Sequence, residues 1–297
     1  FALSRDLGMD PLMVRTGDYD LDGYVDILMP VRQAGGVSKL AIFRNTEADS
    51  VSGGRKFEEV LCRRGCSVEE LTSISNVYAG AMLDLGERGA NDVIVLYVDS
   101  LGKKRAKALL SNMDNGNLFL KTRGLNGVCP EWCPGPVKFP DPKPYGVNPP
   151  GVSFQYMMVD LNNNRLTMLG AQLTHSSMGA LSAPYVMFGL GITHYYIEEL
   201  FMGVPLQTEE SRAGSHKSHC RSWMGLIPNS QIVASPTVAE GGGEWWIAVL
   251  VHAEGVLYVL VVFAITLVGM AITILILKRR EKWLDAIEKQ LTAHAFL

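Results

Sequence analysis

The sequence has little of what an enzyme or a nucleic-acid-binding protein is built from. Among its 297 residues, 27 Lys and Arg stand against 30 Asp and Glu, which gives a net charge of −3. No stripe of basic residues with interleaved aromatics occurs, so we expect no nucleic acid partner. The 6 histidines are scattered, and none lies in an HExxH sequence, a nucleophile elbow or a phosphate-binding loop. We therefore expect no enzymatic activity, because catalysis needs acid, base and nucleophile to converge.

Lys and Arg are missing altogether from Ser222 to Leu277, and Gly255–Leu277 contains no charged residue of either sign. At ~1.5 Å per residue, a helix of this length crosses the ~30 Å hydrocarbon core of a bilayer. The alternative is a buried helix in a globular core. The flanking residues favour the membrane, because Trp245 and Trp246 precede the stretch and Trp283 follows it, as interfacial aromatics do.

The basic run Lys278–Lys282 orients this span. By the positive-inside rule, the residues before Gly255 lie outside the cell or in a lumen, and 278–297 form a cytoplasmic tail. The sequence therefore predicts a single-pass type I membrane protein with the lipid bilayer as one partner. Trp283, Leu284, Ile287 and Leu291 share a helical face in the tail, which predicts a helix that either lies on the headgroups or docks a cytoplasmic partner.

The beginning of the chain lacks both an initiating Met and a signal peptide, since the first residue is Phe1. A type I protein needs a signal to start translocation, so we expect a processed product or the C-terminal part of a longer precursor. No Asn-x-Ser/Thr sequence occurs either, and N-glycans are therefore not expected.

The most informative stretch is Asp18-Tyr-Asp-Leu-Asp-Gly-Tyr-Val-Asp26. Carboxylates at alternate positions converge when the backbone curls, and Gly23 permits the sharp turn. The predicted ligands of a Ca²⁺ ion are the carboxylates of Asp18, Asp20, Asp22 and Asp26 and the carbonyl of Tyr24. An EF-hand is excluded because Met29 stands where its bidentate Glu belongs and a strand-like apolar run follows. The alternative is an acidic surface turn without an ion.

A second stretch, Asp84–Asp92, repeats the first Asp, the sixth-place Gly and the last Asp of this loop. Its second and third carboxylates are replaced by Gly86 and Arg88. Because Arg88 brings a positive charge to the place of a cation, we expect this copy to keep the turn and to have lost the ion. The rest of 1–125 is made of short apolar runs between Gly-rich and Asn-rich turns, which predicts β structure.

The segment Thr16–Leu28 resembles the FG-GAP calcium repeat of integrin-α-like β-propellers. Four further segments make the chain similar to the T-cell immunomodulatory protein family, also called Linkin: Tyr145–Gly151, Gly170–Ser177, Pro184–Gly191 and Ile227–Ile232. The resemblance implies a single-span membrane protein with a large extracellular propeller, of which this chain is the C-terminal half. It also implies that an N-terminal remainder, on the same precursor or a separate chain, completes the propeller. Without that partner, the strands Val25–Val31 and Val93–Val98 are expected to leave an apolar face open to water.

Two close cysteine pairs, Cys62/Cys66 and Cys129/Cys133, are expected to form small disulfide loops in an oxidising compartment, and the resemblance implies the same. A zinc site is the alternative. Cys220 lies outside both pairs, beside His216 and His219, in a Gly/Ser-rich loop or a small metal cluster.

Together these features predict a mainly β chain with five parts. They are FG-GAP propeller blades (1–128), a Cys/Pro-rich linker (129–150), a small β-sandwich similar to the ASPIC/UnbV module (151–240), a transmembrane helix (255–277) and a tail (278–297). The expected function is a calcium-stabilised cell-surface protein for binding, adhesion or modulation, with other membrane or extracellular proteins as partners. The alternative is a structural subunit anchored in a larger assembly, with no soluble ligand.

Overall fold

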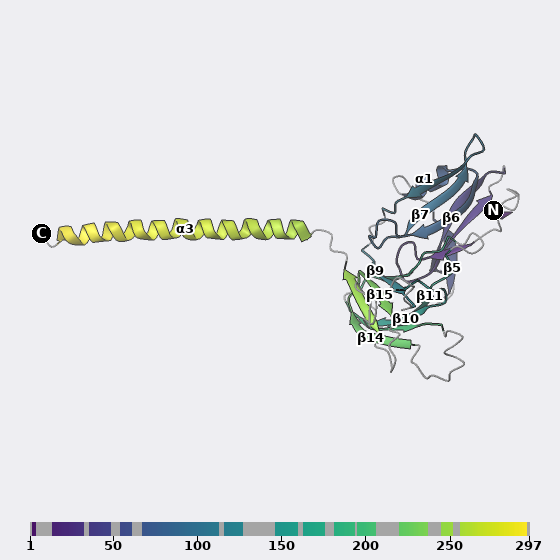
Figure 1. Cartoon of the computed structure of the whole chain (residues 1–297). Coiled ribbons are helices and arrows are strands. Elements are labelled where there is room, and N and C mark those ends of the chain that lie inside the picture. Colours follow the sequence, from purple (N-terminus) through teal and green to yellow (C-terminus); the bar gives the residue numbers. More distant parts are fainter. Residues whose placement is uncertain are drawn as a thin grey trace, which may run out of the picture. The chain divides into compact units, whose positions relative to one another are not determined.

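The structure is a computed structural model, and Figure 1 shows the chain. The residues described below are 2–3, 14–32, 36–48, 54–60, 67–112, 116–126, 146–159, 163–175, 181–193, 195–205, 220–236, 245–251 and 256–295. The chain forms two compact units, Phe1–His252 and Ala253–Leu297. The first unit is built from strands and the second is a helix, so the prediction of a mainly β chain with one apolar C-terminal helix is confirmed.

The first unit begins with an antiparallel five-stranded sheet. Its strands are β1 (Ala2–Leu3), β2 (Arg15–Gly17), β3 (Asp26–Arg32), β4 (Ser38–Glu47) and β5 (Arg55–Glu59). Both β1 and β2 pair with β3, and the order then runs from β3 through β4 to β5. The predicted calcium loop connects β2 to β3, so both of its ends are held by the same pair of hydrogen-bonded strands.

A second, three-stranded antiparallel sheet follows a short helix, α1 (Ser67–Ser73). Its strands are β6 (Val77–Leu83), β7 (Asp92–Val98) and β8 (Lys104–Leu109), in that order. The first two sheets share one hydrophobic core, to which Leu28, Leu40, Val77 and Val95 contribute side chains with exposures of 0–1%. Strands β3 and β7 thus bury their inward side chains against each other's sheets. The prediction that β3 and β7 leave an apolar face open to water is wrong for the side chains that point into this core, because each sheet covers the other within the chain.

The two sheets repeat each other at the offset that the two Asp loops show in the sequence. Strands β3 and β4 correspond to β7 and β8, because Asp26 and Ser38 align with Asp92 and Lys104. The backbone repeats as well, since Leu21 and Glu87 have φ of 59° and 51°, and Gly23 and Gly89 have φ of 93° and 77°. A left-handed backbone costs a glycine little, so both loops use it at the same turn.

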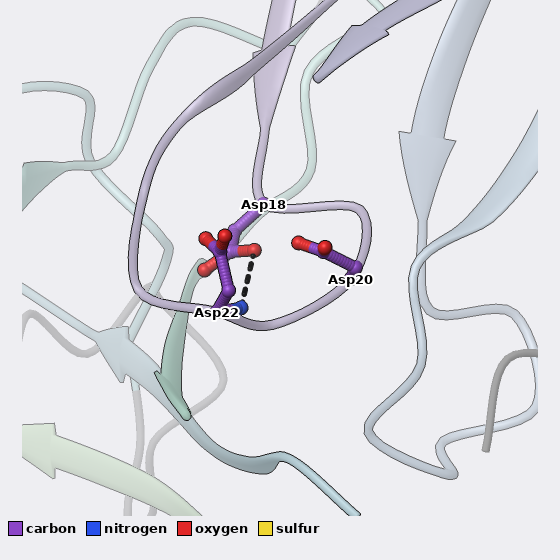
Figure 2. A group of neighbouring side chains, drawn as sticks. All are labelled: Asp18, Asp20 and Asp22. Atoms are coloured by element: carbon purple, nitrogen blue, oxygen red, sulfur yellow. Dashed lines mark hydrogen bonds between the residues drawn. The ribbon is translucent and has the colours of Figure 1, made fainter. Parts of the chain in front are cut away.

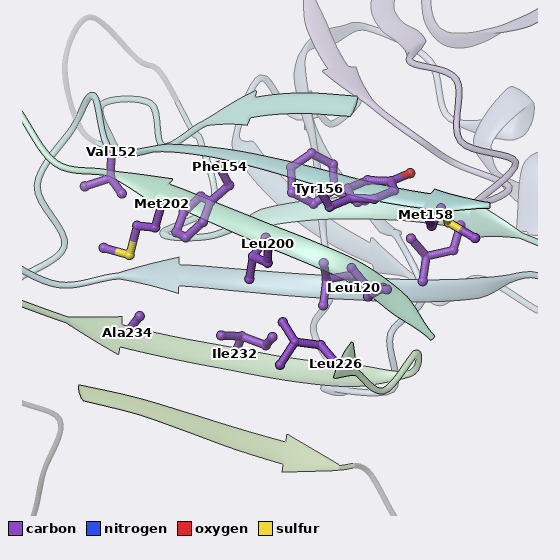
Figure 3. Packing of buried hydrophobic residues seen from close by; sticks show 13 residues of the cluster. Leu120, Val152, Phe154, Tyr156, Met158, Leu200, Met202, Leu226, Ile232 and Ala234 are labelled. Atoms are coloured by element: carbon purple, nitrogen blue, oxygen red, sulfur yellow. The ribbon is translucent and has the colours of Figure 1, made fainter. Parts of the chain in front are cut away.

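The remaining strands form two four-stranded sheets. They are β9 (Leu118–Gly124), β10 (Ser153–Val159), β11 (Arg165–Ala171), β12 (Val186–Gly191), β13 (Ile197–Gly203), β14 (Cys220–Leu226), β15 (Ser230–Ser235) and β16 (Trp246–Val251). One sheet has the order β11-β10-β13-β14 and the other β12-β9-β15-β16. Side chains from both sheets meet in one core, with Phe154, Leu200, Leu120 and Ile232 fully buried (Figure 3). We call this pair of sheets the two-sheet module.

The module reaches beyond the range 151–240 expected from the sequence. Strand β9 was grouped with the propeller blades, but it pairs with β12 on one side and runs parallel to β15 on the other. Strand β16 begins at Trp246, which was expected among the interfacial aromatics before the membrane span, and it completes the same sheet. Trp245 stacks edge-on against Trp223 with ring centroids 6.0 Å apart, so it contributes to this module. Among the described strands, no sheet closes into a barrel.

The second unit contains the helix α3 (Val256–Ala295), which has 40 residues. Within Tyr258–Lys289 an 18-residue window has a mean hydropathy of 2.9, so the helix is long and apolar enough to cross a membrane. From Tyr258 to Leu277 its side chains are exposed, as expected of a helix whose apolar surface faces lipid. The helix continues without a break into the basic region. At ~1.5 Å per residue it is about twice as long as the ~30 Å hydrocarbon core.

Candidate metal centre and its repeat

The loop between β2 and β3 is closed by its first carboxylate. The Oδ1 atom of Asp18 accepts the N–H of Asp22 at 3.1 Å, and its Oδ2 atom accepts the N–H of Gly23 at 2.8 Å. This short acceptor satisfies two backbone donors that the curled loop turns inward. The Asp18 side chain is thereby fixed inside the loop.

The last carboxylate of the loop holds the strands. The Oδ2 atom of Asp26 accepts the N–H of Tyr19 at 2.9 Å, and its Oδ1 atom accepts the N–H of Asn45 at 2.8 Å. Asp26 has no exposed surface. It therefore joins the loop to β4, and both of its oxygens already have backbone partners.

Three of the predicted ligands come together. Asp18, Asp20 and Asp22 each contribute one carboxylate oxygen to a group of three that lie within 4.8 Å of one another, and Figure 2 shows the three side chains in the loop. Asp26 is not part of this group. Tyr24 contributes its N–H to Asp22 Oδ1 at 2.9 Å, and its ring lies under the Arg55 guanidinium, 3.2 Å from the ring centroid.

One basic side chain reaches the acidic group. The Arg44 guanidinium is paired with Asp20, and its Nη2 atom lies 3.5 Å from Asp22 Oδ2. Three carboxylates thus share a single positive charge within the described residues. Carboxylate oxygens converging on one point suit a hard divalent cation such as Ca²⁺, and the residues present fit that ion.

Burial makes this arrangement electrostatically costly without a cation. Burial, partly opposed by the backbone hydrogen bond from Gly23, raises the pKa of Asp18 to about 8. Burial likewise raises the pKa of Asp26 to about 6 and moves that of Asp20 upward. Neighbouring carboxylates add repulsion at each of these groups. A divalent ion would supply the missing positive charge.

The second loop repeats the backbone hydrogen bonds that Asp18 and Asp26 accept in the first loop. Asp84 accepts the N–H groups of Arg88 at 2.9 Å and Gly89 at 3.1 Å. Asp92 accepts those of Leu85 at 3.1 Å and Ser111 at 2.8 Å. The two loops therefore have the same backbone structure, as the sequence predicted from three matching residues.

The copies differ in where their positive charge comes from. In the second loop, Arg88 Nη2 lies 3.0 Å from Asp92 Oδ1, and Lys121 Nζ lies 3.1 Å from Asp84 Oδ2. The sequence pointed to Arg88 but not to Lys121, which comes from β9 and is only 2% exposed. The Lys121 ammonium also lies 4.3 Å from the centroid of the Tyr185 ring, and the Tyr185 hydroxyl accepts the Asp84 N–H at 2.6 Å. The sequence does offer one sign of this role, because a lysine within a strand that begins with three apolar residues is unlikely to be buried unless it is paired.

The first loop is attached to both neighbouring parts of the unit. The Asn91 amide donates to the Asp18 carbonyl at 2.5 Å, and the Asn117 amide donates to the Asp20 carbonyl at 2.7 Å. From β12, the Gly191 N–H donates to the Leu21 carbonyl at 2.9 Å. A Cβ atom at Gly189 would overlap Asp18 Oδ2 and the Leu21 backbone. The candidate metal centre therefore lies where the repeated sheets meet the two-sheet module.

The four cysteines expected to form disulfides, Cys62, Cys66, Cys129 and Cys133, lie outside the described residues, as do His216 and His219. Cys220 begins β14, and its side chain is exposed.

Comparison with known proteins places these features in a family. A family model described as "ITFG1, C2 domain" matches residues 144–249. This range covers the two-sheet module from before β10 to β16, and it names a C2 domain where the sequence suggested an ASPIC/UnbV-like module.

Several curated proteins match almost the whole chain. The T-cell immunomodulatory protein homolog of Plasmodium falciparum (isolate 3D7) is 31% identical over 291 residues, which cover 94% of this chain and 38% of that protein. The T-cell immunomodulatory protein of Homo sapiens is 28% identical over 294 residues, which cover 96% and 45%. Protein linkin of Caenorhabditis elegans is 24% identical over 234 residues, which cover 76% and 36%. The chain thus spans less than half the length of these relatives.

Among solved structures, a putative cell adhesion protein from Bacteroides uniformis is 11% identical, with 82% of this chain and 98% of that chain covered. Its TM-score is 0.19, which is too low for any element to be transferred.

Proposed function

This chain belongs to the T-cell immunomodulatory protein family, and from that premise we propose that it is a calcium-stabilised, membrane-anchored protein that binds other proteins outside the cell or in a lumen. The proposal has three parts, namely the anchor, the ion and the binding role, and each has its own support.

The anchor is supported by α3. Its apolar residues are exposed from Tyr258 to Leu277, and Lys278, Arg279 and Arg280 follow directly. We propose that this basic end is cytoplasmic and that Phe1–His252 lies on the opposite side, which is type I topology.

The ion is supported by the single observation that carries the proposal: Asp18, Asp20 and Asp22 converge in a mostly buried loop, where Arg44 pairs with Asp20 and approaches Asp22. The second loop supports it by contrast, because Arg88 and Lys121 occupy the copy in which carboxylates are missing. We propose that Ca²⁺ plays in the first loop the part that these two side chains play in the second.

The binding role is supported by the family and by the repeat. The relatives' names refer to immunomodulation of T cells, and we propose that this chain acts by recognising another protein. We propose that the two repeated sheets are blades of an FG-GAP propeller and that upstream polypeptide completes it. The relatives' greater length supports this part of the proposal.

A second candidate function is that of a structural subunit in a larger membrane assembly. It is favoured by β8, which lies at the edge of its sheet and is exposed from Lys104 to Ala108. An open edge can pair with a strand of another chain, although Lys104, Arg105 and Lys107 guard it against unspecific pairing.

One experiment addresses both candidates. The full chain and its Asp22→Asn variant are extracted from cells in mild detergent, with calcium or with a chelator, and co-purifying proteins are quantified by mass spectrometry. Asp99→Asn is the control for loss of one carboxylate outside the loop, because Asp99 lies in the β7–β8 turn. Substoichiometric partners that are lost with Asp22→Asn and with the chelator support calcium-dependent recognition. A stoichiometric complex that survives both treatments supports the structural subunit and contradicts the binding role.

A further inference from the structure

Arg44 is the basic side chain of the first loop, yet it comes from outside that loop. It lies on β4, one residue before Asn45, whose N–H is donated to Asp26. Its guanidinium pairs with Asp20 and lies 3.5 Å from Asp22 Oδ2. The backbone of β4 is thus held beside the loop, and the long Arg44 side chain reaches the acidic group from there.

The two partners of the Arg44–Asp20 pair differ in how firmly the fold holds them. The side chain of Asp20 is 1% exposed, whereas that of Arg44 is 45% exposed. A guanidinium with almost half of its side chain in water is hydrated as soon as it turns away, whereas a buried carboxylate that loses its cation needs another one. Arg44 is therefore a removable counter-ion, and Asp20 is the fixed partner.

The repeat shows that this arginine is particular to the first loop. Asn45 and Ser111 donate equivalent N–H groups to the last Asp of their loops, so Leu110 takes the place of Arg44 beside the second loop. The second loop instead has Lys121, a cation with 2% exposure that the fold encloses. A permanent cation thus serves one copy, and a removable cation serves the copy with three clustered carboxylates.

Another carboxylate is available to the Arg44 guanidinium on the next strand. Glu58 of β5 is the direct cross-strand partner of Arg44. Side chains of directly opposed residues lie on the same face of a sheet, with Cβ atoms about 4.5–5.5 Å apart. Glu58 is exposed, and its ion pair with Lys56 at 2.8 Å is a weak surface pair. Arg44 can therefore exchange its partners in the loop for Glu58 by rotation of its side chain alone.

We propose that Arg44 is a built-in competitor of calcium, which neutralises Asp20 and Asp22 when no ion is bound and turns to Glu58 when calcium binds; this rests on the proposed calcium site. Two effects of opposite sign follow. The guanidinium stabilises the ion-free loop, because it compensates carboxylates that are buried together. It also lowers the affinity for calcium, because its contacts with both carboxylates are lost on binding and its charge stays close to a divalent ion.

Calcium titration of the full chain in detergent tests the competition. Replacing Arg44 with Gln removes the charge, and we expect the affinity for calcium to rise roughly tenfold while the melting temperature in chelator falls. Arg44→Lys keeps the charge and should retain an affinity close to that of the wild type. Arg105→Gln is the matched control, because Arg105 is 54% exposed and pairs with Asp99 of the β7–β8 turn; it should leave calcium affinity unchanged. A merely structural role of Arg44 would instead lower stability and affinity together.

A chemical measurement on the wild type needs no substitution. Phenylglyoxal modifies arginine side chains, and peptide mass spectrometry gives the rate at each position. We expect Arg44 to react several-fold faster in calcium than in chelator, because its pairing with the buried Asp20 is given up, whereas Arg105 should react at one rate. Glu58→Gln changes an exposed residue and removes the second partner, so it should lower calcium affinity several-fold.

The outcomes separate this inference from the calcium site itself. A wild type that binds calcium, together with an Arg44→Gln variant that binds it equally or more weakly, leaves the site standing and overturns the competition. Equal reactivity of Arg44 in calcium and in chelator, in a protein that binds the ion, overturns it in the same way. Absence of calcium binding in both the wild type and Arg44→Gln overturns the calcium site and the competition together.

Discussion

The Lys121 ammonium and the Asp84 carboxylate form an ion pair at 3.1 Å in which both side chains are almost fully buried. Lys121 belongs to the two-sheet module through β9, whereas Asp84 opens the second loop of the repeat. A buried pair of this kind joins two parts of the chain with little solvent screening, and it leaves an uncompensated charge when one partner is removed.

Replacing Lys121 with Met should therefore destabilise the first unit strongly. Asp84 would remain buried without its cation, and loss of one partner from a buried pair costs about 3–5 kcal/mol. Urea unfolding of the variant measures the loss. The double variant Lys121→Met/Asp84→Asn should recover part of it, because the buried charge is gone; a double variant less stable than the single one would show that the pair does not act as a unit.

The sequence predicts the ion pairs of the second loop only where the two partners are close along the chain. Arg88 is four residues from Asp92, so the spacing alone predicted that it lies inside the loop. Lys121 is 37 residues from Asp84, and only the pairing of β9 with β12 and β15 brings it there. By the repeat offset, β9 corresponds roughly to β5, and the sequence grouped it with the propeller blades of 1–128. It pairs instead in the β12-β9-β15-β16 sheet, where the apolar side chains of Phe119 and Leu120 are buried.

The loop itself was the more predictable part. Alternate carboxylates before a strand-like run specify the curled backbone, and Asp18, Asp20 and Asp22 do converge. Asp26 was expected to face the ion, yet its oxygens accept the N–H groups of Tyr19 and Asn45. That role depends on the neighbouring strand β4, which spacing within the loop does not specify.

Substituting Asp20 and Asp22 with Asn should weaken calcium binding and reduce calcium-dependent stabilisation. Two of the three clustered carboxylates lose their charge, and we expect affinity to fall by at least about tenfold, or ~1.4 kcal/mol. Wild-type protein at a calcium concentration of 100 times its Kd gains about 2.7 kcal/mol, whereas the variant at the same concentration should gain no more than about 1.4 kcal/mol. Calorimetric titration and thermal melting give both quantities. The Asp99→Asn control, which loses the ion pair with Arg105, should keep the calcium affinity of the wild type. Equal affinity for all three proteins would show that Ca²⁺ does not bind in this loop.

The stability of the calcium-free protein should fall as pH rises. The pKa of Asp18 is raised to about 8 and that of Asp26 to about 6, against ~3.9 in the unfolded chain. The folded state therefore holds protons that the unfolded state releases, and this contribution is complete below about pH 4 and lost as pH passes 6 and then 8.

Calcium should reverse that trend, because the ion binds the ionised carboxylates. Thermal melts at pH 5 and pH 8, each with chelator and with saturating calcium, test both the pH dependence of the calcium-free protein and its reversal by calcium. We expect the stabilisation by calcium to be larger at pH 8. A larger effect at pH 5 would contradict the carboxylate assignment.

The cysteine prediction concerns pairing within short loops. We expect Cys62 to be joined to Cys66 and Cys129 to Cys133, because each pair is close in sequence and the proposed topology places them in an oxidising compartment. Non-reducing peptide mass spectrometry identifies the bonds directly. Peptides linking the two pairs to each other, or zinc recovered with the purified protein, would refute this arrangement.

The last prediction concerns the contact between the candidate metal loop and β12. Gly189 lies so close to Asp18 Oδ2 and the Leu21 backbone that an added methyl group overlaps both. Replacing Gly189 with Ala must therefore displace the Asp18 carboxylate or separate the loop from β12. Overpacking of this kind costs about 1–3 kcal/mol, and displacement of Asp18 should lower calcium affinity as well. Gly203→Ala is the matched control in β13, because its added Cβ would lie 3.0 Å from the small Ser153 side chain and far from the loop. Unfolding and calcium titration of both variants test the coupling. Loss of stability in Gly189→Ala with unchanged calcium affinity would show that the loop keeps its geometry without β12.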